Sequence, residues 1–243
     1  MRSLVFGASA GLGRALARAF AARGHALVLL ARDERDLEAE AKHLRTVHGT
    51  QVEWHAVDAT DPAKVVQVLA SLAREPPVSN LVFPLGMAFA GDDGALPLAA
   101  TVALVNANLI SVMATVGVFL PAMLAGNLGN VVGIGSVAAL RGRSNNVAYA
   151  AAKRGLESYF ESLRHRTAAT GVRVQFYRLG YLDTQLTFGK RLPFPLASPQ
   201  PVAERVARGL GRDLGCVTTP AYWRAVGVAV RCLPWPIFRR LKF

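Results

Sequence analysis

The chain has 243 residues, of which 52% are hydrophobic and 18% are charged, and its formal net charge is +12. This composition argues against disorder and supplies enough apolar material for one large α/β domain. The 28 Lys and Arg residues against 16 Asp and Glu make nucleic acid, anionic lipid or a phosphorylated ligand worth considering, but no aromatic-basic motif of a nucleic-acid module occurs. We therefore expect no nucleic-acid partner.

The cysteines and histidines indicate neither a disulfide framework nor a metal site. Cys216 and Cys232 are the two cysteines, and neither has a metal-ligand neighbour. The five histidines show no paired or HExxH spacing. The sequence therefore predicts no metal and a reducing, cytoplasmic compartment.

Short apolar runs alternate with helical patterns along the whole chain, which is typical of parallel strands joined by right-handed crossovers. We expect a single doubly wound, Rossmann-type domain with helices on both faces of a mainly parallel seven-stranded sheet. The predicted strands are Leu4 to Phe6, Ala26 to Leu30, Val52 to Val57, Asn80 to Pro84, Asn130 to Ile134, Val172 to Tyr177 and a short one near Val217. The predicted helices are Leu12 to Ala22, Glu34 to His48, Pro62 to Arg74, Leu98 to Leu124, Asn146 to Thr170 and Pro199 to Leu214.

The stretch GASAGLG follows the first predicted strand and opens a helix. Its glycines Gly7, Gly11 and Gly13 allow a sharp turn and let a pyrophosphate approach bare backbone at the positive end of the helix. An ordinary glycine-rich turn is the alternative, and the position directly after a strand favours a dinucleotide site.

The residue at the end of the second strand reads the adenosine ribose in such a fold, and here it is Arg32. A guanidinium suits the 2′-phosphate of NADP, so Arg32 favours NADP over NAD. The alternative is that Arg32 is a solvated loop charge and Asp33 reads the ribose. Asp58, after the third strand, is placed to accept the adenine amino group or to cap a helix.

The apolar run from Thr101 to Ala125 is long enough to span a bilayer, but Asn106, Asn108 and Pro121 would be costly there. A buried helix or a subunit interface is the better interpretation.

Tyr149 and Lys153 stand one helical turn apart in the stretch YAAAK. Residues i and i+4 share a helix face, so the lysine charge is expected to lower the pKa of the phenol and let it exchange protons near neutral pH. The pair alone is a weak motif.

At this point the sequence resembles the short-chain dehydrogenase/reductase family over nearly its whole length. The resemblance rests on the three glycines, on Ser136 thirteen residues before Tyr149, on Lys153, and on Asn108 in NLIS. It implies hydride transfer between a nicotinamide and a carbonyl or alcohol. Read singly, Asn108 is equally well a buried residue satisfied by backbone, Ser136 a turn hydroxyl and Lys153 part of a solvated face; read together, they favour catalysis.

The resemblance implies a role for each of these residues. Tyr149 would protonate the carbonyl oxygen, and Lys153 would lower the tyrosine pKa and touch the nicotinamide ribose. Ser136 would orient the carbonyl, and Asn108 would hold a water that resupplies the proton through Lys153. The implied NADP contacts are Gly7, Ser9, Ala10, Gly11, Leu12, Gly13, Arg32, Asp58, Ala59, Leu85, Gly86, Tyr149, Lys153, Gly180, Leu182 and Thr184.

The sequence departs from the family pattern at two turns. Phe83-Pro84-Leu85-Gly86 stands where most relatives carry Asn-Asn-Ala-Gly, and Leu179-Gly180 stands where they carry proline-glycine. Gly86 still permits close approach to the cofactor. We expect these changes to adjust the nicotinamide pocket without abolishing it.

Residues 221–243 are expected to form an amphipathic extension of the catalytic domain, residues 1–220. This extension mixes Trp223, Trp235 and Phe238 with five basic residues and no acid, which suits peripheral contact with the inner membrane face. The alternative is that it packs on the domain or on a second subunit. Together with residues 141–159, it resembles the branch of the family that reduces a decaprenyl-phosphate-linked 2-keto pentose.

The sequence therefore favours an NADPH-dependent reductase of a carbonyl, with a keto sugar on a lipid phosphate as the particular substrate. A soluble reductase of small or acyl ketones is the alternative, followed by a catalytically silent NADP-binding regulator. Relatives pair through the two long helices, here Leu98 to Leu124 and Asn146 to Thr170, so a homodimer is expected.

Overall fold

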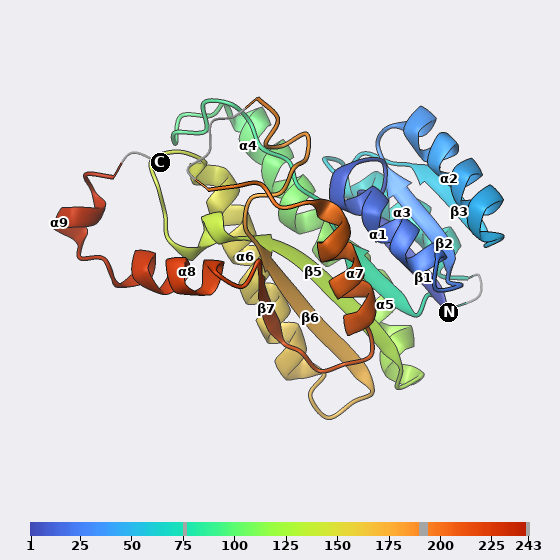
Figure 1. Ribbon diagram of the computed structural model, residues 1–243. Helices are drawn as coiled ribbons and strands as arrows, with labels where there is room; N and C mark the ends of the chain where they lie inside the picture. The colour runs from blue at the N-terminus through green and yellow to red at the C-terminus, as the bar shows by residue number, and fades with distance from the viewer. Residues whose placement is uncertain (75–76, 190–193, 242–243) are drawn as a thin grey trace.

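The computed structural model describes residues 1–74, 77–189 and 194–241. A seven-stranded sheet lies between two layers of helices (Figure 1). Every strand pairs in parallel with its neighbours, in the order β3-β2-β1-β4-β5-β6-β7. The strands are β1 (Arg2–Phe6), β2 (Ala26–Ala31), β3 (Val52–Ala56), β4 (Asn80–Phe83), β5 (Gly129–Ser136), β6 (Val172–Leu179) and β7 (Cys216–Thr219). The predicted doubly wound fold is confirmed.

Two sets of helices cover the sheet. On one face lie α1 (Gly11–Ala21), α2 (Glu34–His48) and α7 (Pro199–Gly209). On the other face lie α3 (Pro62–Leu72), α5 (Ser111–Ala125) and α6 (Val147–Arg166). Each layer has its own hydrophobic core, one around Leu16, Phe20 and Val206 and the other around Phe119, Phe160 and Phe176. Because both faces are covered, the central strands read as continuous apolar runs instead of alternating ones.

The helix boundaries follow local capping. The Asp33 side chain accepts a hydrogen bond from the Asp36 N–H at 3.0 Å and starts α2, which ends at Gly49 in the left-handed region. Asp61 accepts from the Lys64 N–H and Pro62 is the first residue of α3. The predicted helices over 146–170 and 199–214 are longer than the observed α6 and α7, because periodicity does not locate a C-terminal end.

The predicted long helix after residue 98 is a continuous run of three segments. These are α4 (Leu98–Val105), a π-helical turn η1 (Asn106–Ile110) and α5. Within the described residues this run, Leu98–Ala125, is long and apolar enough to cross a membrane by length and composition alone. Its α5 portion packs on α3 and contributes Val112, Val116 and Phe119 to one core.

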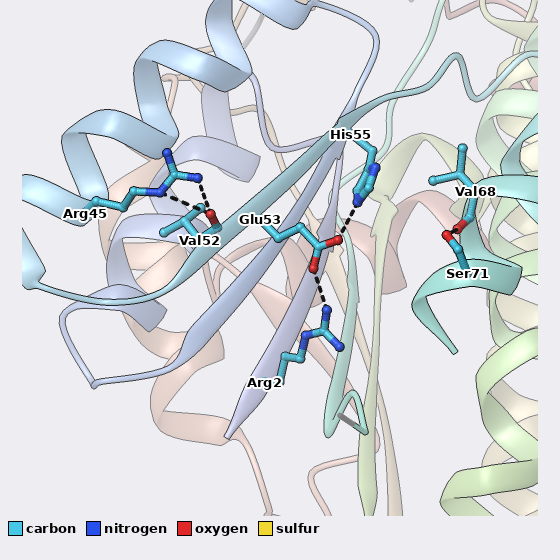
Figure 2. Close-up of polar contacts among 7 residues, drawn as sticks. All are labelled: Arg2, Arg45, Val52, Glu53, His55, Val68 and Ser71. Atoms are coloured by element: carbon cyan, nitrogen blue, oxygen red, sulfur yellow. Dashed lines mark hydrogen bonds and ion pairs between the residues drawn. The ribbon is translucent and has the colours of Figure 1, made fainter. Parts of the chain in front are cut away.

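The outer strand β3 is held to the sheet by polar contacts shown in Figure 2. Arg2 on β1 donates to Glu53 on β3 at 2.5 Å, and His55 contacts the other oxygen of Glu53 at 2.7 Å. Arg45 on α2 donates to the Val52 carbonyl. These contacts tie α2 and β1 to β3.

The C-terminal segment leaves the sheet after β7 and extends away from the domain (Figure 1). It contains two helices that periodicity did not indicate, α8 (Trp223–Cys232) and the short α9 (Trp235–Phe238). Trp223 is buried, and α8 contacts the 3-10 turn η2 (Val137–Leu140) that follows β5. Residues 242–243 of the predicted 221–243 extension lie outside the described residues.

Candidate active site

A cleft of about 1350 Å³ lies at the carboxyl ends of the strands, where the strand order reverses between β1 and β4. Such a switch point leaves a crevice because the connections on its two sides run to opposite faces of the sheet. The cleft is lined by the glycine turn and Arg32, by Tyr149, and by the segment after β6, whose Thr184 lies against Gly11. The predicted residues that line it are Gly7, Ser9, Ala10, Gly11, Leu12, Arg32, Asp58, Ala59, Leu85, Gly86, Ser136, Tyr149, Lys153, Gly180, Leu182 and Thr184.

The glycine turn fits a pyrophosphate. Gly7 has φ +103° and Gly11 has φ +50°, both disfavoured for other residues. A Cβ at Gly13 would lie 1.8 Å from the Gly7 carbonyl oxygen, so only glycine lets α1 begin here. Ala10, at the N-cap of α1, makes no side-chain cap hydrogen bond. The first turn of the helix thus presents backbone N–H groups to the cleft, the arrangement that binds phosphate.

At the adenosine end of the cleft, the structure distinguishes the roles of Arg32, Asp33 and Asp58, which the sequence left open. The Asp33 carboxylate caps α2, whereas Arg32 is exposed beside the cleft. Asp58 does not cap a helix; it accepts the Thr60 N–H at 2.8 Å, and Asp61 caps α3. This arrangement favours Arg32 as the group that meets a ribose substituent.

Ser136, Tyr149 and Lys153 come together at the other end of the cleft. Ser136 ends β5, and its hydroxyl accepts the Ala138 N–H at 3.1 Å and lies close enough to Tyr149 to lower the pKa of the phenol. Lys153 lies on the same side of α6 as Tyr149, with its Nζ 6.0 Å from the centre of the tyrosine ring. Lys153 is buried, and Nζ donates to the Leu85 carbonyl at 2.6 Å and to the Ile134 carbonyl at 3.2 Å.

The expectation that Lys153 lowers the tyrosine pKa is not met in the structure. Burial raises the pKa of Tyr149, while the nearby Ser136 hydroxyl and the charge of Arg143 lower it. Burial also lowers the pKa of Lys153 to about 7, so its positive charge is partly lost at neutral pH. The charge that favours ionisation of Tyr149 therefore comes from Arg143, a residue that sequence reasoning did not single out.

Asn108 lies in the π-helical turn and is fully buried, and its amide is not directed into the cleft lining. Its oxygen accepts the Met87 N–H at 3.2 Å, and its nitrogen donates to the carbonyls of Met87 at 2.8 Å and Leu104 at 2.9 Å. The structure therefore supports the alternative interpretation of Asn108, in which the side chain is buried and its amide is hydrogen-bonded to backbone groups. Asn108 fixes the segment after Gly86 because its amide binds both backbone groups of Met87.

Asp92 is a second residue that sequence reasoning missed. Its carboxylate is 3% exposed and accepts the N–H groups of Ala148 and Tyr149, both at 2.9 Å, and its carbonyl accepts the Val147 N–H. A loop carboxylate thus caps α6, since the N-cap residue Asn146 makes no side-chain cap bond. An aspartate between Gly91 and Gly94 is typical of a turn. Sequence reasoning missed its role because no local pattern indicates a hydrogen-bond partner 56 residues away.

Gly180, the glycine that this chain shares with the family pattern, packs against the C-terminal segment. A Cβ at Gly180 would lie 1.9 Å from Nε1 of Trp223, so the buried indole occupies the space that any larger residue would need. Trp223 also packs on the rings of Tyr181 and Phe194, at 5.2 and 4.7 Å between centroids. The segment after β6, which lines the cleft, is therefore built against α8.

Within the described residues, no group of three or more His, Cys, Asp or Glu side chains could hold a metal ion. The glycine turn at a helix start, together with a hydroxyl, a phenol and an amine in one cleft, defines the class of protein as a dinucleotide-dependent oxidoreductase.

Comparison with known proteins agrees with this class. The short chain dehydrogenase family matches residues 2–192. The chain therefore belongs to the short-chain dehydrogenase/reductase family. It is 32% identical over 240 residues to the uncharacterized oxidoreductase Rv2073c of Mycobacterium tuberculosis, covering 98% of this chain and 96% of the relative. It is 34% identical over 244 residues to an uncharacterized oxidoreductase of Streptomyces coelicolor, covering 98% and 94%.

Two solved structures of similar fold are complexes with nucleotides. A short-chain dehydrogenase from Sphingobium yanoikuyae in complex with NADPH has a TM-score of 0.85 and 26% identity, with 99% of this chain and 96% of that chain covered. An alcohol dehydrogenase from Thermococcus sibiricus complexed with 5-hydroxy-NADP has a TM-score of 0.75 and 26% identity, covering 89% and 94%.

Proposed function

We propose that this protein reduces a carbonyl group to an alcohol with NADPH. The observation that carries the proposal is that Ser136, Tyr149 and Lys153 meet in the same cleft as a glycine turn that fits a pyrophosphate. The exposed Arg32 beside that cleft and the nucleotides bound by the two similar structures support NADPH over NADH.

The residues of the chain would bind the cofactor, orient the substrate carbonyl and protonate its oxygen. NADPH, when bound, supplies the hydride. The first turn of α1 would hold the pyrophosphate, and Arg32 the 2′-phosphate. Ser136 would hydrogen-bond the substrate oxygen, and Tyr149 would give its hydroxyl proton to that oxygen. Lys153, whose Nζ donates to the Leu85 and Ile134 carbonyls and whose pKa is about 7, would return a proton to the tyrosine.

The test is NADPH oxidation with a panel of ketones and keto sugars. Tyr149→Phe keeps the ring and removes the proton donor, so kcat should fall by about a hundredfold or more, a larger effect than any change in the Kd for NADPH. A Tyr149→Phe enzyme as fast as the native one on every substrate would instead favour a catalytically silent NADP-binding regulator. Arg32→Glu should raise the Kd for NADPH without raising that for NADH.

For the substrate, we propose a keto group on a lipid-linked, phosphorylated sugar. The support comes from the C-terminal segment, where Val228, Trp235 and Ile237 are 63%, 63% and 51% exposed. Arg141 holds this segment, since it donates to the Val230 and Leu233 carbonyls and lies 3.8 Å above the Phe238 ring. Turnover of simple ketones but not of a polyprenyl-phosphate keto sugar would favour a soluble reductase of small or acyl ketones.

The same segment supports peripheral contact with the inner membrane face by a cytoplasmic enzyme. Its exposed arginines, Arg224, Arg231, Arg239 and Arg240, accompany the exposed apolar side chains, which suits an anionic lipid surface. Deleting residues 232–243 should reduce sedimentation with vesicles of anionic phospholipid and leave the weak sedimentation with neutral vesicles unchanged. Equal binding of the shortened and full chains to anionic vesicles would contradict this contact.

A homodimer through the long helices is the proposed assembly. On α4 and α5, Leu98 is 80%, Val102 47% and Met113 38% exposed, and such apolar surface suits burial against a second copy. Light scattering should give twice the chain mass of 25.9 kDa, and Val102→Glu should shift the protein toward the monomer. A native chain that is monomeric at every concentration would contradict the proposal.

A further inference from the structure

The π-helical turn η1 changes which side chains share a face of the long helical run. In an α-helix, each residue is rotated by about 100° from the last, so residues five apart point in directions about 140° apart. In a π-helix, hydrogen bonds join residues five apart and bring them onto one face. Here the Ser111 N–H donates to the Asn106 carbonyl. Asn106 and Ser111 are therefore stacked on the same face.

These two stacked side chains donate to neighbouring backbone carbonyls in the turn that follows β3. Asn106 Nδ2 donates to the Thr60 carbonyl at 2.9 Å, and Ser111 Oγ donates to the Ala59 carbonyl at 2.6 Å. Ser111 is fully buried and Asn106 is half-buried. A buried donor and acceptor that lose each other are costly to leave unpaired. The two hydrogen bonds therefore fix the position of this turn from helical residues 46 and 52 positions away.

The turn that is held in this way, residues 58–60, forms part of the cleft wall at the adenosine end. All three of its residues line the cleft, as does Ala107 of η1. On its other side the turn is tied to β2, because the Val57 N–H donates to the Ala31 carbonyl at 2.7 Å, next to Arg32. The wall of the adenosine end is therefore fixed both from the strand that leads to Arg32 and from η1.

We propose that Asn106 and Ser111 are positioning residues for the adenosine half of the dinucleotide. The proposal deepens the NADPH-dependent reduction proposed above and rests on its cofactor site. By holding two carbonyls of the 58–60 turn, the two side chains form this wall before the cofactor arrives, so binding does not have to order it. Asn108 in the same π-helical turn binds the Met87 backbone after β4 instead. Asn106 and Ser111 thus act on cofactor affinity and not on the reacting groups.

The test is calorimetric titration of the full-length chain with adenosine 2′,5′-bisphosphate, a probe that carries the adenosine half of NADP and no nicotinamide. Ser111→Ala removes one hydroxyl, and Asn106→Leu removes the amide donor at similar size without adding a charge. Each variant should raise the Kd for the bisphosphate and for NADPH by about three- to tenfold, as expected for the loss of one hydrogen bond. The kcat at saturating NADPH should stay close to the native value, because both hydrogen bonds go to the 58–60 turn.

Thr115→Val is the matched control. Thr115 is fully buried on α5, and its hydroxyl donates at 2.7 Å to the Ser111 carbonyl within the same helix. The substitution removes a buried hydroxyl from this helix but leaves the contacts with the 58–60 turn in place, so neither Kd should change. Thermal unfolding checks that each variant folds. If Ser111→Ala does not fold, Asn106→Leu decides, because Asn106 is only half-buried.

The outcomes separate this proposal from the proposed function, since binding of the bisphosphate requires no turnover. A native Kd in the folded variants overturns the positioning role. A rise in Kd that Thr115→Val reproduces, or a fall in kcat as large as the rise in Kd, also overturns it, because either result indicates a general loss of packing. If no ketone or keto sugar is reduced but Ser111→Ala weakens binding of the bisphosphate, the positioning role stands and the reduction fails. If the native chain reduces a ketone with NADPH and does not bind the bisphosphate, the reduction stands and the positioning role fails.

Discussion

Replacing Asp92 by alanine should impair catalysis more than it impairs folding. The Asp92 carboxylate is buried and accepts the N–H groups of Ala148 and Tyr149, which belong to the first turn of α6. Without it, these two half-buried N–H groups lose their partners. The backbone of Tyr149 is then no longer held against the loop after Gly86, where Met87 is fixed by Asn108.

The size of the effect follows from these two bonds. Loss of a helix cap costs about 0.5–2 kcal/mol, and a buried donor left without a partner costs about 1–3 kcal/mol. We therefore expect Asp92→Ala to lower the free energy of unfolding by about 2–4 kcal/mol, which a domain of ordinary stability survives. A shift of Tyr149 by about 1 Å should lower kcat by up to about a hundredfold.

The assay measures kcat, KM and the Kd for NADPH together with urea unfolding. Asp61→Ala is the matched control, because Asp61 caps α3 through the Lys64 N–H but lies on the surface away from Tyr149. Asp61→Ala should lower the free energy of unfolding by less than Asp92→Ala does, and it should leave kcat unchanged. Asp92→Asn keeps one acceptor and should fall between Asp92→Ala and the native enzyme. If Asp92→Ala folds, binds NADPH and retains native kcat, the carboxylate does not position Tyr149 and the reasoning is wrong.

Three further predictions concern packing and pH. Gly13→Ala would bring a Cβ to 1.8 Å from the Gly7 oxygen, so fluorescence titration should show NADPH binding lost together with a lowered Tm; native affinity would contradict the fit of the turn. Gly180→Ala would collide with the Trp223 indole and should shift tryptophan emission to longer wavelength and raise KM, whereas unchanged emission would contradict the packing of α8. Burial lowers the pKa of His25 from its ordinary 6.5, so its neutral form stabilises the fold above pH 6.5 and that contribution falls as the pH drops through the folded-state pKa. Between pH 7.5 and about 5, the free energy of unfolding measured in urea should decrease less in His25→Gln than in the native chain. The difference should be at most about 1.4 kcal/mol per pH unit. Equal decreases would refute this assignment.

Repeating apolar runs were sufficient to predict the sheet, because strands covered on both faces must be apolar throughout and have few alternative arrangements. Helix ends were harder to predict. The predicted starts of α2 and α6 agree with the structure to within one residue, although Asp33 caps α2 locally and Asp92 caps α6 from a distant loop. The predicted C-terminal ends of α6 and α7 lie too far along the chain. The helices α8 and α9 were not predicted, since their buried residues Trp223 and Phe238 depend on contacts with Gly180 and Arg141.

The sequence by itself determined the family, the glycine turn and the residues Ser136, Tyr149 and Lys153, because each depends on spacing within one element or on a fixed position after a strand. Tertiary structure alone decided that the Asn108 amide binds Met87 backbone, that burial raises the pKa of Tyr149, and that Arg143 and Asp92 act on it. Electrostatic energy and burial depend on distances across the fold, and those distances arise only when loops far apart in the chain are brought together.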